Sequence, residues 1–337
     1  MSASEHPLSH AKGGGQSVSK EYACFRHVLA CVKGACCARA VLTHAATIAS
    51  AVGAKVTVLH VLESSTPQEP MDPVEWSLRH CDQTEFLQQC LSHFNNLHAD
   101  IVIVAGPPAE RITDWAQEHE ADLVVIGRGS DHSSVSVGLG YTARRITEIA
   151  NASVLVVPSQ APAHTVPGYQ KILIPLDGSA RSECVLPLGL GLAAAASAQV
   201  MLMHVAPKID LIEPNQLNAE VIALREQLHQ HNERAARQYL DWLRSRLPAP
   251  PITHTRLLPS SDPRLALEHA ASEEQADLLV ISALGNSGHA QLVMGSVADY
   301  LINRITIPIL LVRQCLAKSH RLRGQETELR RPNQGQI

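Results

Sequence analysis

The stretch ADLLVI at residues 276–281 decides the fold, because residues 121–126 carry nearly the same stretch, ADLVVI, 155 positions earlier (276 − 121). Three more apolar stretches recur in the same order, and the pairs are 27–34 with 171–178, 55–61 with 199–205, and 153–157 with 308–312. The first two pairs are offset by 144 residues (171 − 27) and the last by 155, so one connection is 11 residues longer (155 − 144) in the second half. Ordered self-similarity of this kind indicates two tandem copies of one domain.

Short apolar runs alternate with helical patterns in each copy. In the first copy the runs are β-branched, free of charged residues and located at 28–32, 56–62, 101–104, 123–126 and 154–157. Such runs are typical of strands buried on both faces of a parallel sheet. Helical patterns lie between them, at 38–52, 86–97 and 110–118. Each copy is therefore predicted to be an α/β domain of order β-α-β-(long connection)-β-α-β-α-β, with a doubly wound, Rossmann-like parallel sheet of five strands.

The second copy carries its own helix signals. Apolar residues recur there at helical spacing, at Val221, Leu224, Leu228, Ala235 and Trp242. Asp262-Pro263 has the form of a helix start, with an N-cap followed by proline at the first helical position. Residues 184–207 contain no Asp, Glu, Lys or Arg, which suggests a membrane-spanning helix. The repeat instead splits this run into a crossover helix and a strand, as in residues 40–63, so no membrane segment is expected.

Composition excludes several functions. A net charge of −4 and 3% aromatic residues argue against nucleic-acid binding, which needs a basic face or stacking platforms. The polar N-terminus lacks the apolar core of a signal peptide. None of the eight cysteines forms a C-x-x-C pair, which favours reduced thiols and a cytoplasmic location. No metal-ligand spacing is present.

A glycine-containing loop follows the ADLLVI strand and leads into a helical pattern, over residues 281–301. Backbone N–H groups are open at a helix N-terminus and the helix dipole favours negative charge, so such a loop can bind phosphate. Ser296-x-x-Asp299 also has the form of a capping box, in which Ser296 would satisfy the donors of its own helix. The loop alone leaves phosphate binding and tight packing both open.

A second segment, IPLDGS at residues 174–179, places Asp177 at the carboxyl end of the first strand of the second copy. Ligands of doubly wound sheets bind at this edge. A carboxylate there can accept hydrogen bonds from ribose hydroxyls, help to hold a hydrated metal, or cap the next turn. Val205 ends the neighbouring strand and would form an apolar wall. No P-loop, G-x-G-x-x-G or G-x-S-x-G sequence occurs.

Five pieces in order resemble a universal stress protein domain, and they are Pro175-x-Asp-Gly-Ser179, Met203-His-Val205, 276–281, Gly295-Ser-Val297 and 308–312. The likeness covers about 23–160 and 168–314, so the chain resembles a tandem universal stress protein. This implies two adenine nucleotide alpha hydrolase-like domains that pack as a pseudo-dimer through the strand that closes each domain. The expected organisation is a disordered polar tail (1–22), a degenerate domain (23–160), a linker (161–167), an ATP-type domain (168–316) and a second disordered tail (317–337).

Members of this family that bind ATP carry a loop of the form G-x2-G-x9-G-[S/T]. The second copy keeps three of the four elements, as Ser282-x2-Gly285-x9-Gly295-Ser296. The resemblance implies that the ligand is ATP, with or without Mg²⁺, in the C-terminal domain only. Pro175, Asp177 and Val205 would surround adenine and ribose, Gly285, Gly295, Ser296 and Val297 would meet the phosphates, and Gly178, Ser179 and Ser282 would complete the site.

The first copy departs further from this pattern. Its loop reads Gly127-x2-Ser130-x9-Gly140-Tyr141, and Lys33 replaces the first-strand aspartate. Such a loop offers fewer suitable donors, so this half is predicted not to bind nucleotide.

Together these features predict a cytoplasmic stress-response protein in which adenine nucleotide is a regulatory ligand. No constellation pairs a catalytic base with a nucleophile, so no enzyme is expected. An interaction scaffold that binds no nucleotide is the alternative, and a slow ATPase is the third reading. A positive φ at Ser282, or a Ser282 side chain that fills the cleft, would favour the scaffold. A homodimer and an unidentified protein partner are compatible with each reading.

Overall fold

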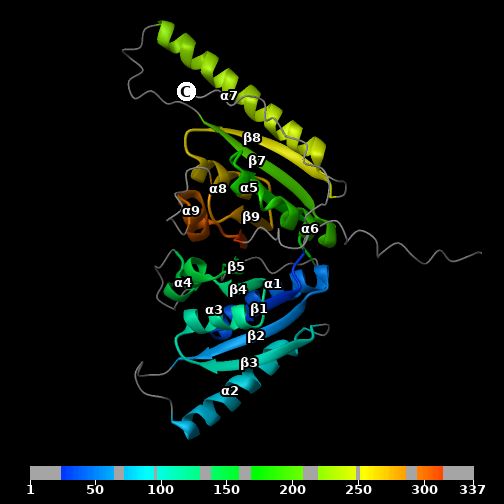
Figure 1. Cartoon of the computed structure of the whole chain (residues 1–337), viewed down its shortest axis with the longest axis vertical. Helices are drawn as coiled ribbons and strands as arrows, with labels where there is room; N and C mark the ends of the chain where they lie inside the picture. The colour runs from blue at the N-terminus through cyan, green and yellow to red at the C-terminus, as the bar shows by residue number, and fades with distance from the viewer. Residues whose placement is uncertain are drawn as a thin grey trace, which may run out of the picture.

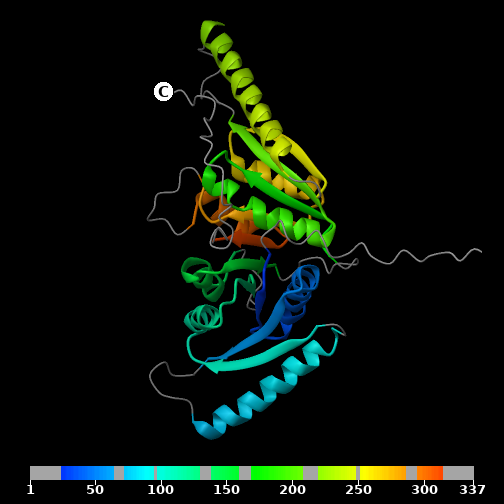
Figure 2. The same cartoon turned by 45° about the vertical axis from the view of Figure 1, so that its right-hand side comes forward.

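A computed structural model describes residues 24–63, 72–94, 97–129, 138–158, 168–207, 219–247, 251–285 and 294–313, without the side chain of Cys36. Ten strands form one continuous sheet along the length of the molecule (Figures 1 and 2). Their order is β3-β2-β1-β4-β5-β10-β9-β6-β7-β8, which is one five-stranded order followed by its mirror image in sequence. The predicted tails (1–22 and 317–337) and linker (161–167) lie outside the described residues.

The N-terminal half contains the expected alternation. Its elements are β1 (His27–Cys31), α1 (Ala35–Val52), β2 (Lys55–Leu62), α2 (Pro73–Leu91), β3 (Ala99–Ala105), α3 (Pro108–Glu118), β4 (Leu123–Gly127), α4 (Tyr141–Ile149) and β5 (Ser153–Val157). The strands of this half pair in parallel.

The C-terminal half repeats this order with one short additional helix. Its elements are β6 (Lys171–Leu176), α5 (Ala180–Glu183), α6 (Leu186–Ala196), β7 (Gln199–Pro207), α7 (Ala219–Arg246), β8 (Thr253–Ser260), α8 (Pro263–Glu273), β9 (Leu278–Ser282), α9 (Ser296–Arg304) and β10 (Ile309–Val312). The uncharged run 184–207 divides into α6 and β7, as the repeat predicted. Among the helices described, none is long and apolar enough to cross a membrane.

The aspartate of the repeated ADL stretch fixes the start of the central strand in each half. The carboxylate of Asp122 accepts hydrogen bonds from the N–H groups of Arg26 and His27, at 2.9 and 3.0 Å. Asp277 does the same for Gln170 and Lys171, at 2.5 and 3.2 Å. Each aspartate therefore sets the register between a central strand and its neighbour, which gives the repeated stretch a structural reason.

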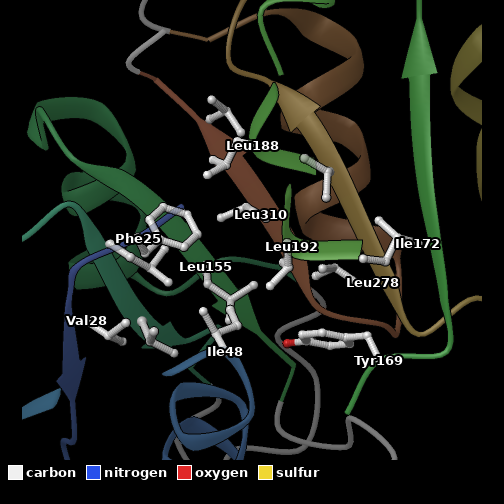
Figure 3. Close-up of a cluster of buried hydrophobic side chains, with 14 of the residues drawn as sticks. Phe25, Val28, Ile48, Leu155, Tyr169, Ile172, Leu188, Leu192, Leu278 and Leu310 are labelled. Atoms are coloured by element: carbon white, nitrogen blue, oxygen red, sulfur yellow. The ribbon is translucent and has the colours of Figure 1, made fainter. Parts of the chain in front are cut away.

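The two halves join through β5 and β10, the only antiparallel pair among the described strands. Leu155 lies opposite Leu310, and these residues are equivalent in the repeat, so the pseudo-twofold axis passes through this pair. Both lie among buried side chains from the two halves, including Phe25 and Tyr169 (Figure 3). The predicted pseudo-dimer is thus present within one chain, and each of its two buried hydrophobic clusters contains residues from both halves.

The apolar repeat of α7 does not face the sheet. The helix itself is confirmed, but Val221, Leu224, Leu228 and Trp242 are exposed. The side of α7 that covers the sheet is instead formed by Ala236, Leu240 and Leu243. The first part of α7 reaches beyond β8 (Figure 1).

Candidate functional site

Asp177 and Gly285 face each other at the carboxyl edge of the second half-sheet. Asp177 follows the end of β6 directly, and Gly285 lies in the loop that leaves β9. A Cβ built on Gly285 would lie 2.5 Å from Asp177 Oδ2. Because that distance is below any normal carbon–oxygen contact, a side chain at position 285 would push the Asp177 carboxylate aside, whereas glycine leaves it in place. The two segments that the sequence placed at this edge are therefore in contact.

The turn that follows Asp177 is fixed by its own hydrogen bonds. Asp177 Oδ1 accepts from the N–H of Ser179 at 2.9 Å, and Gly178 between them has φ +80. Ser179 Oγ accepts from the N–H of Ser182 at 3.1 Å and thereby caps α5. The turn role considered for Asp177 is thus present, and its other oxygen is directed toward Gly285.

The loop closes on Gly295 through the backbone. The N–H of Gly295 donates to Ala283 O at 2.8 Å, and Gly295 is the N-cap of α9. No side chain among the described residues caps this helix end. The capping-box reading of Ser296 is therefore wrong, because α9 begins at Ser296 itself. The N–H groups at the start of α9 lie before its first backbone bond, from Asp299 N–H to Gly295 O, which suits an anion.

The fold gives no steric reason for glycine at position 295. A Cβ there would meet its nearest atom, Ala283 O, at 3.6 Å, which is an ordinary contact. The backbone at Gly295 has φ −76 and ψ 154, which any residue can adopt. Neither packing nor backbone conformation therefore requires glycine at position 295, the residue that directly precedes the first N–H groups of α9.

Ser282 stands where the ATP-type loop has its first glycine, and the backbone tolerates it. Ser282 is not among the residues with positive φ. Its Oγ donates to Leu284 O at 2.7 Å and lies 3.3 Å from the N–H of Leu284. The Ser282 side chain therefore folds onto its own loop. A positive φ at Ser282, or a Ser282 side chain that fills the cleft, would favour the scaffold, and this geometry meets neither condition.

The neighbouring strands provide the remaining predicted residues. Pro175 pairs with Met203 in the β6–β7 register, and Val205 lies half-buried near the end of β7. His204, the β7 residue that pairs with Leu176, was not among the predicted site residues. Its Nδ1 lies 2.9 Å from Leu176 O, so Nδ1 carries the proton. Burial lowers the pKa of His204, against smaller opposing effects of the bond to Leu176 O and of the Asp177 charge.

The N-terminal half has the same backbone with different side chains. Gly140 N–H donates to Arg128 O at 2.9 Å, which matches the closure in the other half, and Gly140 is the N-cap of α4. Tyr141 occupies the place of Ser296 and is 84% exposed. Lys33, in the place of Asp177, lies 3.6 Å from Glu63 in an exposed ion pair. Ser130, in the place of Gly285, lies outside the described residues.

Within the described part of the chain, no group of three or more His, Cys, Asp or Glu residues could hold a metal ion.

The repeated fold agrees with comparisons to known proteins. The universal stress protein family matches the chain twice, over residues 25–158 and 168–313. The chain belongs to the universal stress protein family. A universal stress protein of Mycobacterium tuberculosis is 20% identical over 279 residues, which are 80% of this chain and 90% of that relative. One of Mycolicibacterium smegmatis is 25% identical over 281 residues, with the same two shares.

Solved structures show the same tandem architecture. A protein of unknown function from Pseudomonas aeruginosa PAO1 aligns with a TM-score of 0.60 and 14% identity, covering 86% of this chain and 92% of that chain. A universal stress protein from Archaeoglobus fulgidus aligns with a TM-score of 0.58 and 13% identity, covering 86% and 98%. At these identities the likeness concerns the fold.

Proposed function

We propose that the C-terminal half of this universal stress protein binds adenine nucleotide, with ATP the expected form, as a regulatory ligand. The observation that carries the proposal is the contact of Asp177 with Gly285 beside the uncapped start of α9. A carboxylate suited to ribose hydroxyls and an anion-favouring helix end thus lie at one edge of the sheet.

Each part of the nucleotide has a counterpart at this edge. Pro175 and Val205 would contact adenine, and Asp177 Oδ2 would accept a hydrogen bond from ribose. The phosphates would lie over Gly285 and Gly295, with the Ser296 hydroxyl and the N–H groups of the first α9 turn as donors. Ser282 closes the loop, and Gly178 and Ser179 hold Asp177 in position. Any Mg²⁺ would arrive on the triphosphate, because Mg²⁺ is usually held by phosphates and few carboxylates.

The N-terminal half is proposed to lack this site. The start of α4 also lacks a side-chain cap among the described residues, but this edge carries Lys33 and Tyr141 instead of a carboxylate and a small hydroxyl. A lysine cannot accept a hydrogen bond from a ribose hydroxyl. Asp177 and its surroundings are therefore expected to restrict binding to one nucleotide per chain.

The nucleotide is proposed to change the state of the protein without being consumed. This proposal rests on the sequence, in which no motif pairs a catalytic base with a nucleophile. The proposed location is the cytoplasm, on the ground of the cysteine pattern alone.

A scaffold that binds no nucleotide is the second candidate. One observation favours it: Asp177 Oδ1 and Ser179 Oγ both have partners within their own turn. In that case the carboxylate would serve only to order the start of α5.

Calorimetric titration of the full chain with ATP, ADP and AMP distinguishes the two candidates. The wild type is expected to bind, and Asp177→Ala is expected to weaken binding roughly 10- to 100-fold, since a hydrogen bond to a charged group contributes about 1.5–3 kcal/mol. Lys33→Ala, at the equivalent position of the other half, is the matched control and should bind as the wild type does. Absence of binding by the wild type would favour the scaffold, and full binding by Asp177→Ala would refute the site.

A further inference from the structure

Helix α9 is held along its length by residues of the N-terminal half. The side chain of Asn303 accepts a hydrogen bond from the N–H of Leu139 at 2.8 Å. Arg128 Nη1 donates to Ile305 O at 2.6 Å, at the C-cap of α9. Asp299 in the first turns pairs with Arg144, with 3.4 Å between the charged atoms. In Figures 1 and 2, α4 and α9 lie on the same side of the sheet at the junction between the halves.

These contacts come from the segment that corresponds to the nucleotide loop. Arg128 is the repeat equivalent of Ala283, and Leu139 is the equivalent of Met294, at the offset of 155 residues (283 − 128). The segment keeps the backbone closure of a nucleotide loop, from Gly140 N–H to Arg128 O. However, the Arg128 side chain and the Leu139 N–H of this segment donate to residues of the C-terminal half. Gly138 permits this approach, with φ +152 and a Cβ position only 3.2 Å from Asn303 Oδ1.

The repeat-equivalent residues of the C-terminal half do not make the same contacts to the N-terminal half. Ala283 offers no donor in the place of Arg128, and Glu148 replaces Asn303 and pairs with Arg145 at 3.6 Å. In the described C-terminal half, Arg313 returns one longer bond, from Nη1 to Glu148 O at 3.3 Å. The non-binding half therefore holds the helix of the binding half more firmly than the reverse.

The Arg128 bond suits its place on the helix. Carbonyl groups at a helix C-terminus carry partial negative charge, so a guanidinium there is stabilising. Arg128 is half-buried, and burial lowers its pKa, so its charge interacts in a partly desolvated setting. The helix has nine residues and is about 13 Å long, so holding its C-terminal end also sets the position of its first N–H groups.

We infer that the N-terminal half acts as a built-in positioning subunit, in which Arg128 and the N–H of Leu139 hold α9 so that its N-terminus is ordered for the phosphates of a nucleotide. This inference rests on the proposed function. Ordering α9 in advance removes a cost that binding would otherwise include. Linkage then requires the converse, namely that bound nucleotide strengthens these contacts.

The test measures ATP affinity by calorimetry in full-chain Arg128→Met and Asn303→Leu. Met retains an apolar stem without donors, and Leu removes the acceptor for Leu139. Both variants are expected to bind ATP on the order of 5-fold more weakly. Asn303→Asp keeps an acceptor for the Leu139 N–H but, like Asn303→Leu, loses the bond from Nδ2 to Asp299 O, so it should bind ATP more tightly than Asn303→Leu. Tyr169→Phe removes a bond between the halves that is distant from α9, and it should leave affinity unchanged.

Hydrogen exchange of the Leu139 amide provides a second measurement. A purely structural role of Arg128 would not make this exchange depend on ATP. ATP should slow exchange of the Leu139 amide in the wild type, and less so in Arg128→Met. If the wild type binds ATP but Arg128→Met and Asn303→Leu bind equally well, this inference is overturned and the proposed function stands. If the wild type does not bind, both are overturned. Should Arg128→Met fail to fold, Asn303→Leu with Asn303→Asp still decides the matter.

Discussion

Arg144 and Asp299 are equivalent residues of the two repeats, and they pair with each other across the interface, with 3.4 Å between Nη2 and Oδ1. Such a contact lies on the pseudo-twofold axis, where identical halves would place two identical side chains together. Identical copies of either half would thus bring together two arginines or two aspartates. Opposite charges at this position favour pairing between the two different halves of the chain.

The first prediction concerns this pair. Asp299→Arg and Arg144→Asp should each lower stability by about 0.5 kcal/mol, because both side chains are about half exposed and such pairs are weak. The double exchange, Arg144→Asp with Asp299→Arg, should recover most of that loss. Urea unfolding of the four proteins at low salt measures the coupling. Additive losses in the double variant would show that the two charges do not interact.

The second prediction concerns the loop glycines in the absence of ligand. Gly285→Ala should destabilise the protein by about 0.5–1.5 kcal/mol, because its Cβ would displace Asp177 Oδ2 and disturb the bond from the Ser179 N–H to Oδ1. Gly295→Ala is the matched control and should be close to neutral, since its Cβ has normal contacts. Thermal unfolding measures both. Combining Gly285→Ala with Asp177→Ala should remove most of the strain, and equal losses at the two glycines would contradict the contact.

The third prediction concerns the buried bond between the halves. Tyr169 is fully buried, and its hydroxyl lies 3.0 Å from His44 Nδ1 on α1. Tyr169→Phe should cost about 1 kcal/mol, the usual contribution of one hydrogen bond. Phe25 is the repeat equivalent, so Phe25→Tyr makes the opposite change. It should also destabilise, because burying a hydroxyl at a site built for a ring costs about 1–3 kcal/mol. A neutral Tyr169→Phe would show that the bond adds nothing.

The fourth prediction concerns pH. Because burial lowers the pKa of His204 in the folded state, the unfolded chain binds this proton more readily. The contribution of His204 to stability is therefore complete above its unfolded pKa of about 6.5 and is lost as pH falls below it. His204→Asn keeps a donor for Leu176 O and does not titrate. Between pH 8 and 5, the melting temperature of the wild type should fall relative to that of His204→Asn, and parallel curves would contradict this assignment.

Asp177 provides an internal check on the same histidine. Its negative charge opposes the lowering of the His204 pKa. In Asp177→Asn the pKa of His204 should therefore fall further, which NMR titration of the imidazole can follow. An unchanged pKa would show that the carboxylate is too well screened to act on the ring.

The strands were predictable because each is a short apolar run that occurs twice. Two independent copies of a weak local signal support each other, and the ADL aspartates fix the register by contacts close to the strands themselves. The edge site followed from topology, since parallel strands bring Asp177 and the 282–296 loop to one end of the sheet.

The rest depended on information that no local pattern contains. The periodicity of α7 predicted the helix but not the side that faces the sheet, which is formed by Ala236, Leu240 and Leu243. The Arg128 bond to Ile305 joins residues 177 positions apart through a backbone carbonyl, which has no sequence signature. The cap of α9 was misread by one residue, because Gly295 and Ser296 both suit an N-cap.

The central claim is that one half of the chain binds nucleotide and the other does not. The most direct measurement is the stoichiometry of ATP binding by equilibrium dialysis in the wild type, Gly295→Val and Gly140→Val. These glycines are equivalent N-caps with similar backbone angles, so the two variants place the same obstruction at the two helix ends. One ATP per chain is expected in the wild type and in Gly140→Val, and none in Gly295→Val. Binding of two nucleotides, or binding that Gly140→Val abolishes and Gly295→Val preserves, would contradict the account.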